Sequence, residues 1–528
     1  MAQADPEVVV GPGRIRGRGQ GGVFAFRGIP YARPPVGRLR FCAPEPPAAW
    51  DGVRDASAFG PAAPQPGAEP PADGADEWLT LNVWTPDPSA GRLPVMVWVH
   101  GGAYLFGSSA EPAYDGTRFA MAGTVLVTCN YRLGVEGFGQ IPGAPANRGL
   151  LDLVAVLRWV ADNIGAFGGD PGNVTVFGES AGAGLIAALL AMDGAGNHST
   201  SDLFRRAIAQ SVPGTFFSPE LASDVTAAVA REAGIAPARE ALAAAGPAAL
   251  VDAAARVTAR MREFGRWGGV RLTDTPFSPV VDGEVLPRAP WPALLGGAAR
   301  EVELLTGHNR DEYRLFTVMS GRHGKITEEE AEAVLEAFAP APGGPDGYLG
   351  AFGDADPGRL FEVVFSDWLF RMPTLHLAQA HAASGGTTYL YELRAEAPAM
   401  NGLLGSCHFL DVPLIFGPPD PGSGPGISDA LLGPDPSAAL LGLGDRMRED
   451  WIRFASGDDP GWSTYGTEHR ATRIYDMPPD VVSYPEEASM RLWQRHQFDV
   501  LGLAAEENTA GENTAEEDAA EEDAAGRG

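Results

Sequence analysis

The stretch Val174–Ala183, V-T-V-F-G-E-S-A-G-A, decides the fold of this 528-residue chain. Its first four residues are apolar or β-branched and predict a buried strand, which ends at G-E-S-A-G. The Ala- and Leu-rich run Leu185–Leu190 then predicts a helix. A strand, a G-x-S-x-G turn and a helix in this order form a nucleophile elbow, which holds a serine on a sharp, strained turn. We therefore interpret Ser180 as a nucleophile, and Gly178 and Gly182 as the residues that keep the turn free of side chains.

Strands alternate with helices on both sides of the elbow, which predicts an α/β fold with a mostly parallel central sheet and right-handed crossovers. Continuous apolar runs are typical of strands buried on both faces. The predicted strands are Leu79–Trp84, Pro94–Val99, Val125–Asn130, the end of Leu203–Gln210, Val302–Thr306 and Thr388–Leu393. The predicted helices are Leu150–Ile164, Glu328–Phe338, Arg359–His381 and a closing helix at Ala488–Leu501.

Two further segments are expected to lie over the core. The Pro-rich stretch Phe26–Gly37 is too apolar for a free linker and predicts an ordered loop. The Ala-rich stretch Ala222–Phe264 predicts helices that form a lid or cap. We expect one domain over residues 8–503, a disordered N-terminus at 1–7 and a disordered acidic tail at 504–528.

Composition limits the partners and the setting of the chain. A net charge of −29 would repel nucleic acid and anionic membranes. No apolar run reaches the roughly 18–20 residues of a spanning helix. Three cysteines without a ligand cluster, and no signal segment in Met1–Arg14, favour a reduced cytoplasm and no metal site. Lys325 is the single lysine among many Arg, Ala, Gly and Pro residues, which indicates a bacterial source.

A serine hydroxyl becomes a strong nucleophile only when a base accepts its proton and an acid orients that base. In a nucleophile-elbow fold the acid and then the histidine follow the serine along the chain. His408 lies in a loop after the strand predicted to end at residue 393 and is the predicted base, whereas His376 and His381 fall in a helical stretch. The loop after the preceding strand contains Asp311 and Glu312. Spacing does not choose between these carboxylates, and the other is expected to be a plain surface charge.

Backbone N–H groups are needed to stabilise the negative charge that develops on the carbonyl oxygen during attack. The stretch His100-Gly101-Gly102-Ala103 follows a buried strand and resembles the H-G-G-G loops that supply such donors. We expect the N–H groups of Gly102 and Ala103, together with that of Ala181 after the nucleophile, to form an oxyanion hole.

These motifs together resemble the type-B carboxylesterases, the branch of the α/β-hydrolases that includes the cholinesterases and bacterial para-nitrobenzyl esterases. The matching stretches are F-R-G-I-P-Y-A-R-P-P-V-G-R-L-R-F at Phe26–Phe41, L-T-L-N-V-W-T-P at Leu79–Pro86, W-V-H-G-G-A at Trp98–Ala103, N-Y-R-L-G at Asn130–Gly134, F-G-G-D-P-G-N-V-T-V-F-G-E-S-A-G-A at Phe167–Ala183 and P-V-V-D-G at Pro279–Gly283. The resemblance runs from about Val8 to Leu501. It implies the α/β-hydrolase fold, with large helical insertions that form a lid over a gorge.

The resemblance also implies a Ser–Glu–His triad. The acid of the family is the Glu of a D-E-G segment, which here is Asp311-Glu312-Tyr313. The resemblance therefore assigns Glu312 as the acid, although Tyr313 replaces the usual Gly, and it assigns His408 as the base. Ser211 and Asp411 are similar to residues that steady the triad in the family.

The activity that the resemblance implies is hydrolysis of small-molecule carboxylic esters through an acyl-enzyme, without metal or cofactor. A hydrolase of carbamates, lactones or amides with the same triad is one alternative, and a catalytically silent cholinesterase-like binding module is another. A silent module is expected to lack a triad residue, whereas all three are present here. The E-D-C-L block of the family reads D-E-W-L at Asp76–Leu79, so the disulfide common in secreted members is missing.

Overall fold

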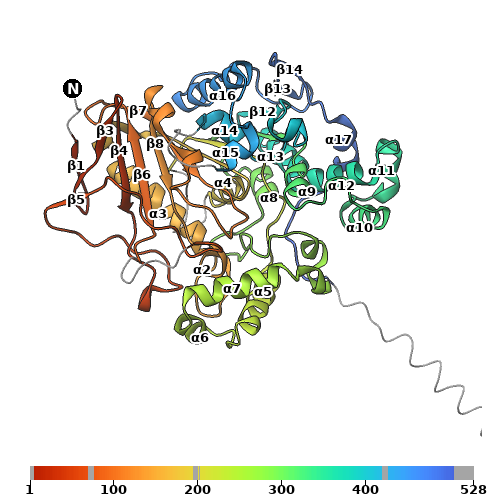
Figure 1. Cartoon of the computed structure of the whole chain (residues 1–528), viewed down its shortest axis with the longest axis horizontal. Helices are drawn as coiled ribbons and strands as arrows, with labels where there is room; N and C mark the ends of the chain where they lie inside the picture. Colours follow the sequence, from red (N-terminus) through yellow and green to blue (C-terminus); the bar gives the residue numbers. More distant parts are fainter. Residues whose placement is uncertain (1–4, 69–75, 194–199, 201, 419–425, 505–528) are drawn as a thin grey trace, which may run out of the picture.

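The structure of the chain, a computed structural model, describes residues 5–68, 76–193, 200, 202–418 and 426–504. Its centre is a sheet that has eleven strands within these ranges (Figure 1). In spatial order the strands are β14 (Asp480–Ser483), β13 (Ala471–Tyr475), β12 (Thr388–Leu393), β11 (Glu303–Asn309), β10 (Arg206–Gln210), β9 (Gly169–Glu179), β7 (Leu93–Val99), β8 (Val125–Cys129), β6 (Thr80–Thr85), β4 (Val23–Pro30) and β3 (Arg18–Gln20). The strands from β13 to β8 are parallel to one another, and those outside them are antiparallel to their neighbours.

A second, three-stranded sheet lies at one end of the molecule and is formed by β1 (Glu7–Val10), β2 (Gly13–Arg16) and β5 (Val53–Asp55) (Figure 1). The described α-helices are α1 (Thr117–Met121), α2 (Gly134–Phe138), α3 (Arg148–Asn163), α4 (Ala181–Ala191), α5 (Pro219–Glu232), α6 (Arg239–Ala244), α7 (Pro247–Thr258), α8 (Pro290–Leu295), α9 (Arg314–Met319), α10 (Glu328–Phe338), α11 (Gly344–Phe352), α12 (Pro357–Ser366), α13 (Met372–Ala383), α14 (Asp411–Phe416), α15 (Ile427–Leu432), α16 (Ala438–Ser456) and α17 (Glu487–Trp493). None of these helices has the length and apolarity needed to cross a bilayer.

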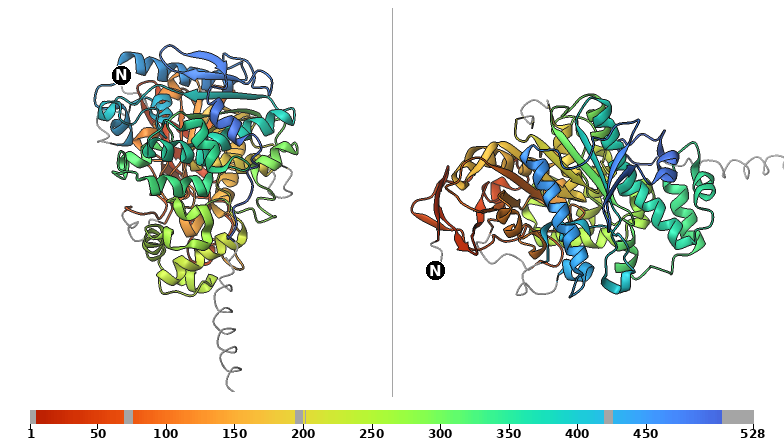
Figure 2. Two further views of the ribbon diagram at one scale, coloured as in Figure 1. Left: turned by 90° about the vertical axis from the view of Figure 1, so that its right-hand side faces the viewer. Right: turned by 90° about the horizontal axis from the view of Figure 1, so that it is seen from above.

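Both faces of the central sheet are covered by helices (Figure 2). Alternate residues of a strand point to opposite faces. Along β7, Val95, Val97 and Val99 belong to a buried cluster shared with α3, α4 and α13. Met96 and Trp98 belong to a second cluster, shared with α1, α14 and α16. Because both faces of the sheet are buried, the central strands are continuous apolar runs in the sequence.

The elbow lies in the middle of this sheet, where β9 ends at Glu179 and α4 begins at Ala181. Ser180 between them has φ 57° and ψ −125°, a strained conformation of the kind that costs about 1–3 kcal/mol. A Cβ atom on Gly178 would lie 2.5 Å from the backbone oxygen of Val99, and one on Gly182 would collide with the same oxygen. The turn therefore requires glycine on both sides of the serine.

The predicted fold class is confirmed, and the differences from the sequence predictions are local. The first part of the predicted loop Phe26–Gly37 belongs instead to β4, which continues to Pro30 past a register shift between Phe26 and Ile29. Residues 31–36 form no helix or strand. The predicted closing helix Ala488–Leu501 ends at Trp493. The segment after it is not helical, because its backbone bonds to a distant segment: Leu501 N–H donates to the Phe216 oxygen at 2.7 Å. Helices α5 to α7, which form the predicted cap, gather on one side of the molecule (Figure 1). Of the predicted acidic tail at 504–528, residues 505–528 lie outside the described residues.

Replacing Gly182 by Ala tests the steric requirement at the elbow. We expect a loss of about 2–3 kcal/mol in the free energy of unfolding, since the added methyl group collides with backbone rather than with a movable side chain. Urea unfolding followed by circular dichroism measures this. Gly442→Ala in α16 is the matched control, because its Cβ meets nothing within 4 Å; an equal effect of the two substitutions would contradict the account.

Candidate active site

The predicted acid and base lie on the loops that follow the neighbouring strands β11 and β12, and the structure brings them together. His408 Nδ1 lies 2.5 Å from Glu312 Oε2. The other oxygen, Oε1, accepts the hydroxyl of Ser211 at 2.6 Å and the backbone N–H of Asn309 at 2.8 Å. Burial alone would raise the pKa of the Glu312 carboxyl, but His408 and these donors hold it below its usual value. Glu312 is therefore a buried, ionised carboxylate that fixes the imidazole.

The second imidazole nitrogen of His408, Nε2, lies 3.0 Å from Glu179 Oε1, an ion-pair contact whose angles do not suit a hydrogen bond. The rings of Phe316 and Phe370 pack on the imidazole, with centroids 5.3 and 4.2 Å away. Burial alone would lower the pKa of His408, but the carboxylates of Glu179 and Glu312 raise it to about 10. Burial raises the pKa of Glu179 to about 7, against the opposing effect of His408. His408 and Glu179 thus form a buried pair in which each group shifts the pKa of the other.

Ser180 lies directly after Glu179 and is half-buried. Its backbone N–H donates to the oxygen of Gln210 at 2.9 Å, whereas its hydroxyl makes no hydrogen bond within the described part of the chain. A Cβ on Gly101 would lie 3.2 Å from Ser180 Cβ and 3.0 Å from Glu179 Oε2. The loop that was predicted to supply the oxyanion hole therefore passes beside the serine.

The three predicted oxyanion donors have no acceptor in the described ranges. Gly102 and Ala103 have positive φ values of 110° and 53°, and neither backbone N–H donates to a protein group there. Ala181 is the first residue of α4, so its N–H is one of the four at a helix N-terminus that lack an intrahelical partner. These N–H groups therefore have no competing acceptor in the described ranges, and their role as an oxyanion hole stays a prediction.

Ser211 and Asp411, the two predicted supporting residues, occupy different places. Ser211 contacts Glu312 directly. Asp411 accepts hydrogen bonds from Gln210 Nε2 at 2.8 Å and from the Tyr391 hydroxyl at 2.9 Å. Because the Gln210 backbone oxygen also binds the N–H of Ser180, Asp411 connects through Gln210 to Ser180 rather than to Glu312. Sequence reasoning missed Gln210 and Tyr391, since only the folded sheet brings them to this edge.

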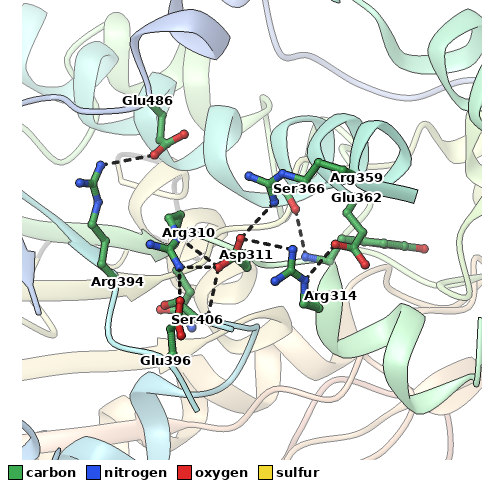
Figure 3. Close-up of polar contacts among 12 residues, drawn as sticks. Arg310, Asp311, Arg314, Arg359, Glu362, Ser366, Arg394, Glu396, Ser406 and Glu486 are labelled. Atoms are coloured by element: carbon green, nitrogen blue, oxygen red, sulfur yellow. Dashed lines mark hydrogen bonds and ion pairs between the residues drawn. The ribbon is translucent and has the colours of Figure 1, made fainter. Parts of the chain in front are cut away.

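Asp311, the rejected acid, is not a surface charge as expected: only 4% of it is exposed. Figure 3 shows its carboxylate among arginines, with Arg310 Nε at 3.0 Å, Arg359 Nη1 at 3.1 Å and Arg314 Nη2 at 3.8 Å. Burial alone would raise the pKa of Asp311, but these guanidinium groups lower it. The charge of Asp311 is therefore matched inside the protein and does not face the imidazole.

Asp311 also joins the loop of the acid to the loop of the base. Its N–H donates to the oxygen of Ser406 at 2.8 Å, and its Oδ2 accepts the Ser406 N–H at 3.2 Å. Further along the same two loops, the N–H of His408 donates to the backbone oxygen of Glu312 at 3.2 Å. Asn309 Nδ2 donates to the oxygen of Cys407 at 2.7 Å. The distance between acid and base is thus set by backbone pairing of the two loops.

Other histidines have partners that account for them. The ring of His100 stacks on Tyr131 with centroids 4.4 Å apart, and its Nδ1 contacts the oxygen of Gly101. His381 contacts the Thr388 hydroxyl. Among the residues that the structure describes, no three His, Cys, Asp or Glu side chains are grouped to hold a metal ion.

The Asp311 cluster, which is Asp311 with its arginine partners Arg310, Arg314 and Arg359, makes the free energy of unfolding depend on pH in the acid range. The folded-state pKa of Asp311 is lowered, so its contribution is present above the unfolded pKa and is lost as the pH falls through the folded value. We expect Asp311→Asn to lower the free energy of unfolding by about 1–3 kcal/mol at pH 7, because the partly exposed arginines lose a buried partner. The difference from the parent protein should shrink towards about pH 3.

Urea unfolding across this pH range measures the effect. Glu487→Gln is the control, because it breaks the exposed pair with Arg491 and is expected to change stability by less than about 0.5 kcal/mol. A loss for Asp311→Asn that is the same at both ends of the range would show that the charge of Asp311 is not what stabilises the loops.

Comparison with known proteins assigns this arrangement to a family. The sequence matches the Carboxylesterase family over residues 4–339. It is 36% identical to the para-nitrobenzyl esterase of Bacillus subtilis (strain 168), over 90% of this chain and 95% of that protein. It is 34% identical to the phenmedipham hydrolase of Pseudarthrobacter oxydans, over 88% and 93% of the two chains.

Solved structures of carboxylesterases have the same fold as this chain. Carboxylesterase EST55 of Geobacillus stearothermophilus superposes with a TM-score of 0.79 at 35% identity, covering 92% of this chain and all of the other. A structure of PNB esterase superposes with a TM-score of 0.78 at 32% identity, covering 93% and 99% of the two chains. The chain therefore belongs to the carboxylesterase family and is a carboxylic ester hydrolase with the α/β-hydrolase fold.

Proposed function

We propose that the chain is a serine carboxylesterase in which Ser180, His408 and Glu312 form the catalytic triad. The observation that supports this most is the position of one imidazole: Nδ1 lies on the buried carboxylate of Glu312, and Nε2 lies at the residue before Ser180. Ser180 Oγ attacks the ester carbonyl carbon while Nε2 takes its proton, and the same proton then passes to the departing alcohol. Water repeats the sequence on the acyl-enzyme and releases the acid.

Glu179 has a second role in this proposal. In the resting arrangement its carboxylate stabilises the charged imidazole, which cannot accept a proton from the serine. A substrate that turns Nε2 from Glu179 towards Ser180 removes that stabilisation and lowers the pKa of His408. The imidazolium then releases its Nε2 proton to water, and the neutral ring can accept the proton of Ser180. The oxygen that becomes negative during attack is bound by the N–H groups of Gly102, Ala103 and Ala181, each of which is expected to contribute about 3–4 kcal/mol to the transition state.

The setting we propose is the cytoplasm of a bacterium. The three cysteines, Cys42, Cys129 and Cys407, are free thiols, which suits a reducing compartment. The net charge of −29 disfavours nucleic acid and anionic membranes as partners. Uncharged small esters are not repelled by this charge, and para-nitrobenzyl esters are a natural first choice because a relative carries that name.

Substitution of the triad tests the chemistry. Ser180→Ala is expected to lower kcat/KM for para-nitrophenyl butyrate by about 10⁴–10⁶-fold, because no covalent intermediate can form. Glu312→Gln is expected to lower it by about 10³–10⁴-fold, because the neutral amide neither fixes the ring nor stabilises the imidazolium. Release of para-nitrophenol measures both. A rate within tenfold of the parent for Ser180→Ala would refute the proposed nucleophile.

The conservative change Glu179→Gln tests the second carboxylate through pH. Glu179 raises the pKa of His408, so its removal lowers that pKa and leaves the imidazole neutral at lower pH. The acidic limb of the kcat/KM profile should therefore move down by about one pH unit. A limb that stays in place, with folding intact by circular dichroism, would show that Glu179 does not hold the proton of His408.

A panel of esters with graded acyl chains, compared with a carbamate, a lactone and an anilide of similar size, defines the substrate class. We expect the esters to give the highest kcat/KM, since an alcohol leaves more readily than an amine from the same tetrahedral intermediate. A carbamate, lactone or amide that exceeds every ester would reassign the activity within the family.

A further inference from the structure

A cavity of about 550 Å³ lies away from the triad, among five segments that are distant in the sequence. Its walls come from α8, α13 and α17, the loop before β13, and residues 494–499. A volume of this order is typical of small-molecule sites, which measure about 300–1,000 Å³. The reaction proposed above uses none of its residues. We call it the α8–α13–α17 cavity.

One side of this cavity is aromatic and apolar. Trp291 and Phe498 line it with ring centroids 5.1 Å apart. The indole N–H of Trp291 donates to the oxygen of Pro373 at 2.9 Å, which fixes the ring. Leu295, which also lines the cavity, is 61% exposed. Rigid aromatic walls beside exposed apolar surface favour binding of a flat or apolar group.

The other side carries a positive charge without an anion. Arg470 lines the cavity, and its Nε is buried without a hydrogen-bond partner. Its Nη1 faces the sulfur of Met490 at 3.3 Å, and thioether sulfur is a weak acceptor. No carboxylate in the described ranges forms an ion pair with Arg470, although the chain has 68 acidic residues against 39 basic ones. Its Nη2 has no hydrogen-bond partner in the described ranges and is not among the buried nitrogens, so this end of the guanidinium is available to an anion.

The remaining polar groups do not neutralise this charge. The His376 imidazole lines the cavity, and burial lowers its pKa to about 4, so it is uncharged at pH 7. Gln379 Nε2 donates to the Tyr465 hydroxyl at 3.4 Å, and both are neutral. Asp499 is exposed at the rim, and its Oδ1 accepts the N–H of Val500. The cavity thus combines an aromatic side with one cation that forms no ion pair with a described carboxylate, and its other charged residue, Asp499, is exposed.

We propose that the α8–α13–α17 cavity binds a small monocarboxylate with an aromatic or apolar body. The carboxylate accepts hydrogen bonds from the guanidinium of Arg470, and the body packs against Trp291 and Phe498. Carboxylate is favoured because the planar guanidinium binds it through two parallel N–H donors, and because a single charge matches the single cation. A dianion such as phosphate has no apolar part to fill the aromatic side.

The test uses the full chain and two probes, sodium 4-phenylbutyrate and its neutral amide, in isothermal titration calorimetry. The parent protein should bind the acid at least tenfold more tightly than the amide. Arg470→Gln should weaken binding of the acid at least tenfold. Arg491→Gln, on the exposed side of α17, should leave it unchanged. Ser180→Ala should also bind as the parent does, which separates this site from the triad and from the proposed function.

A second variant keeps the test valid if Arg470→Gln does not fold. Ala383 lines the cavity and is exposed, so Ala383→Trp should fill the mouth and abolish binding without disturbing the core. The proposal is overturned if the parent does not bind the acid at millimolar concentration, if Arg470→Gln folds and binds as the parent does, or if Ser180→Ala alone loses binding.

Discussion

The site depends on one buried carboxylate, Glu312, whose two oxygens both have hydrogen-bond partners. An ionised group in a dry interior is costly unless each oxygen is hydrogen-bonded. Here Oε1 has the Ser211 hydroxyl and the Asn309 N–H, and Oε2 has the imidazole of His408. Because the charge is retained, Nδ1 stays on Glu312, and Nε2 lies at Glu179, the residue before the proposed nucleophile. Loss of any of these donors would weaken the orientation as well as the charge.

The scaffold supplies this arrangement by placing three strand ends at one edge of a parallel sheet. β9, β11 and β12 end at the elbow, the acid loop and the base loop, and parallel strands bring their carboxyl ends together. The strained turn at Ser180 is maintained because its glycines fit against the backbone of β7. The Asp311 cluster then secures the two loops to each other. Strain at the nucleophile and matched charge at the acid are therefore supported by separate parts of the fold.

The sequence was sufficient where chemistry and periodicity coincide in a short stretch. The elbow, the central strands and the helix Glu328–Phe338 were predicted because each is defined by neighbouring residues. Spacing did not choose between Asp311 and Glu312, since the two adjacent carboxylates differ only in the direction in which their side chains point. The arginines that surround Asp311 include Arg359, which is distant in the sequence. The contact of Glu179 with His408 was missed although Glu179 lies inside the motif. Leu501 was wrongly predicted as helical because its pairing with Phe216 is non-local.

The most direct test of the account is the proton on His408 Nδ1, observed by proton nuclear magnetic resonance at low temperature. A short N–H···O bond to a buried carboxylate moves this resonance far downfield. We predict such a resonance in the parent protein, its loss in Glu312→Gln and its retention in Asp311→Asn. A downfield resonance that persists unchanged in Glu312→Gln would contradict the claim that this carboxylate holds the imidazole.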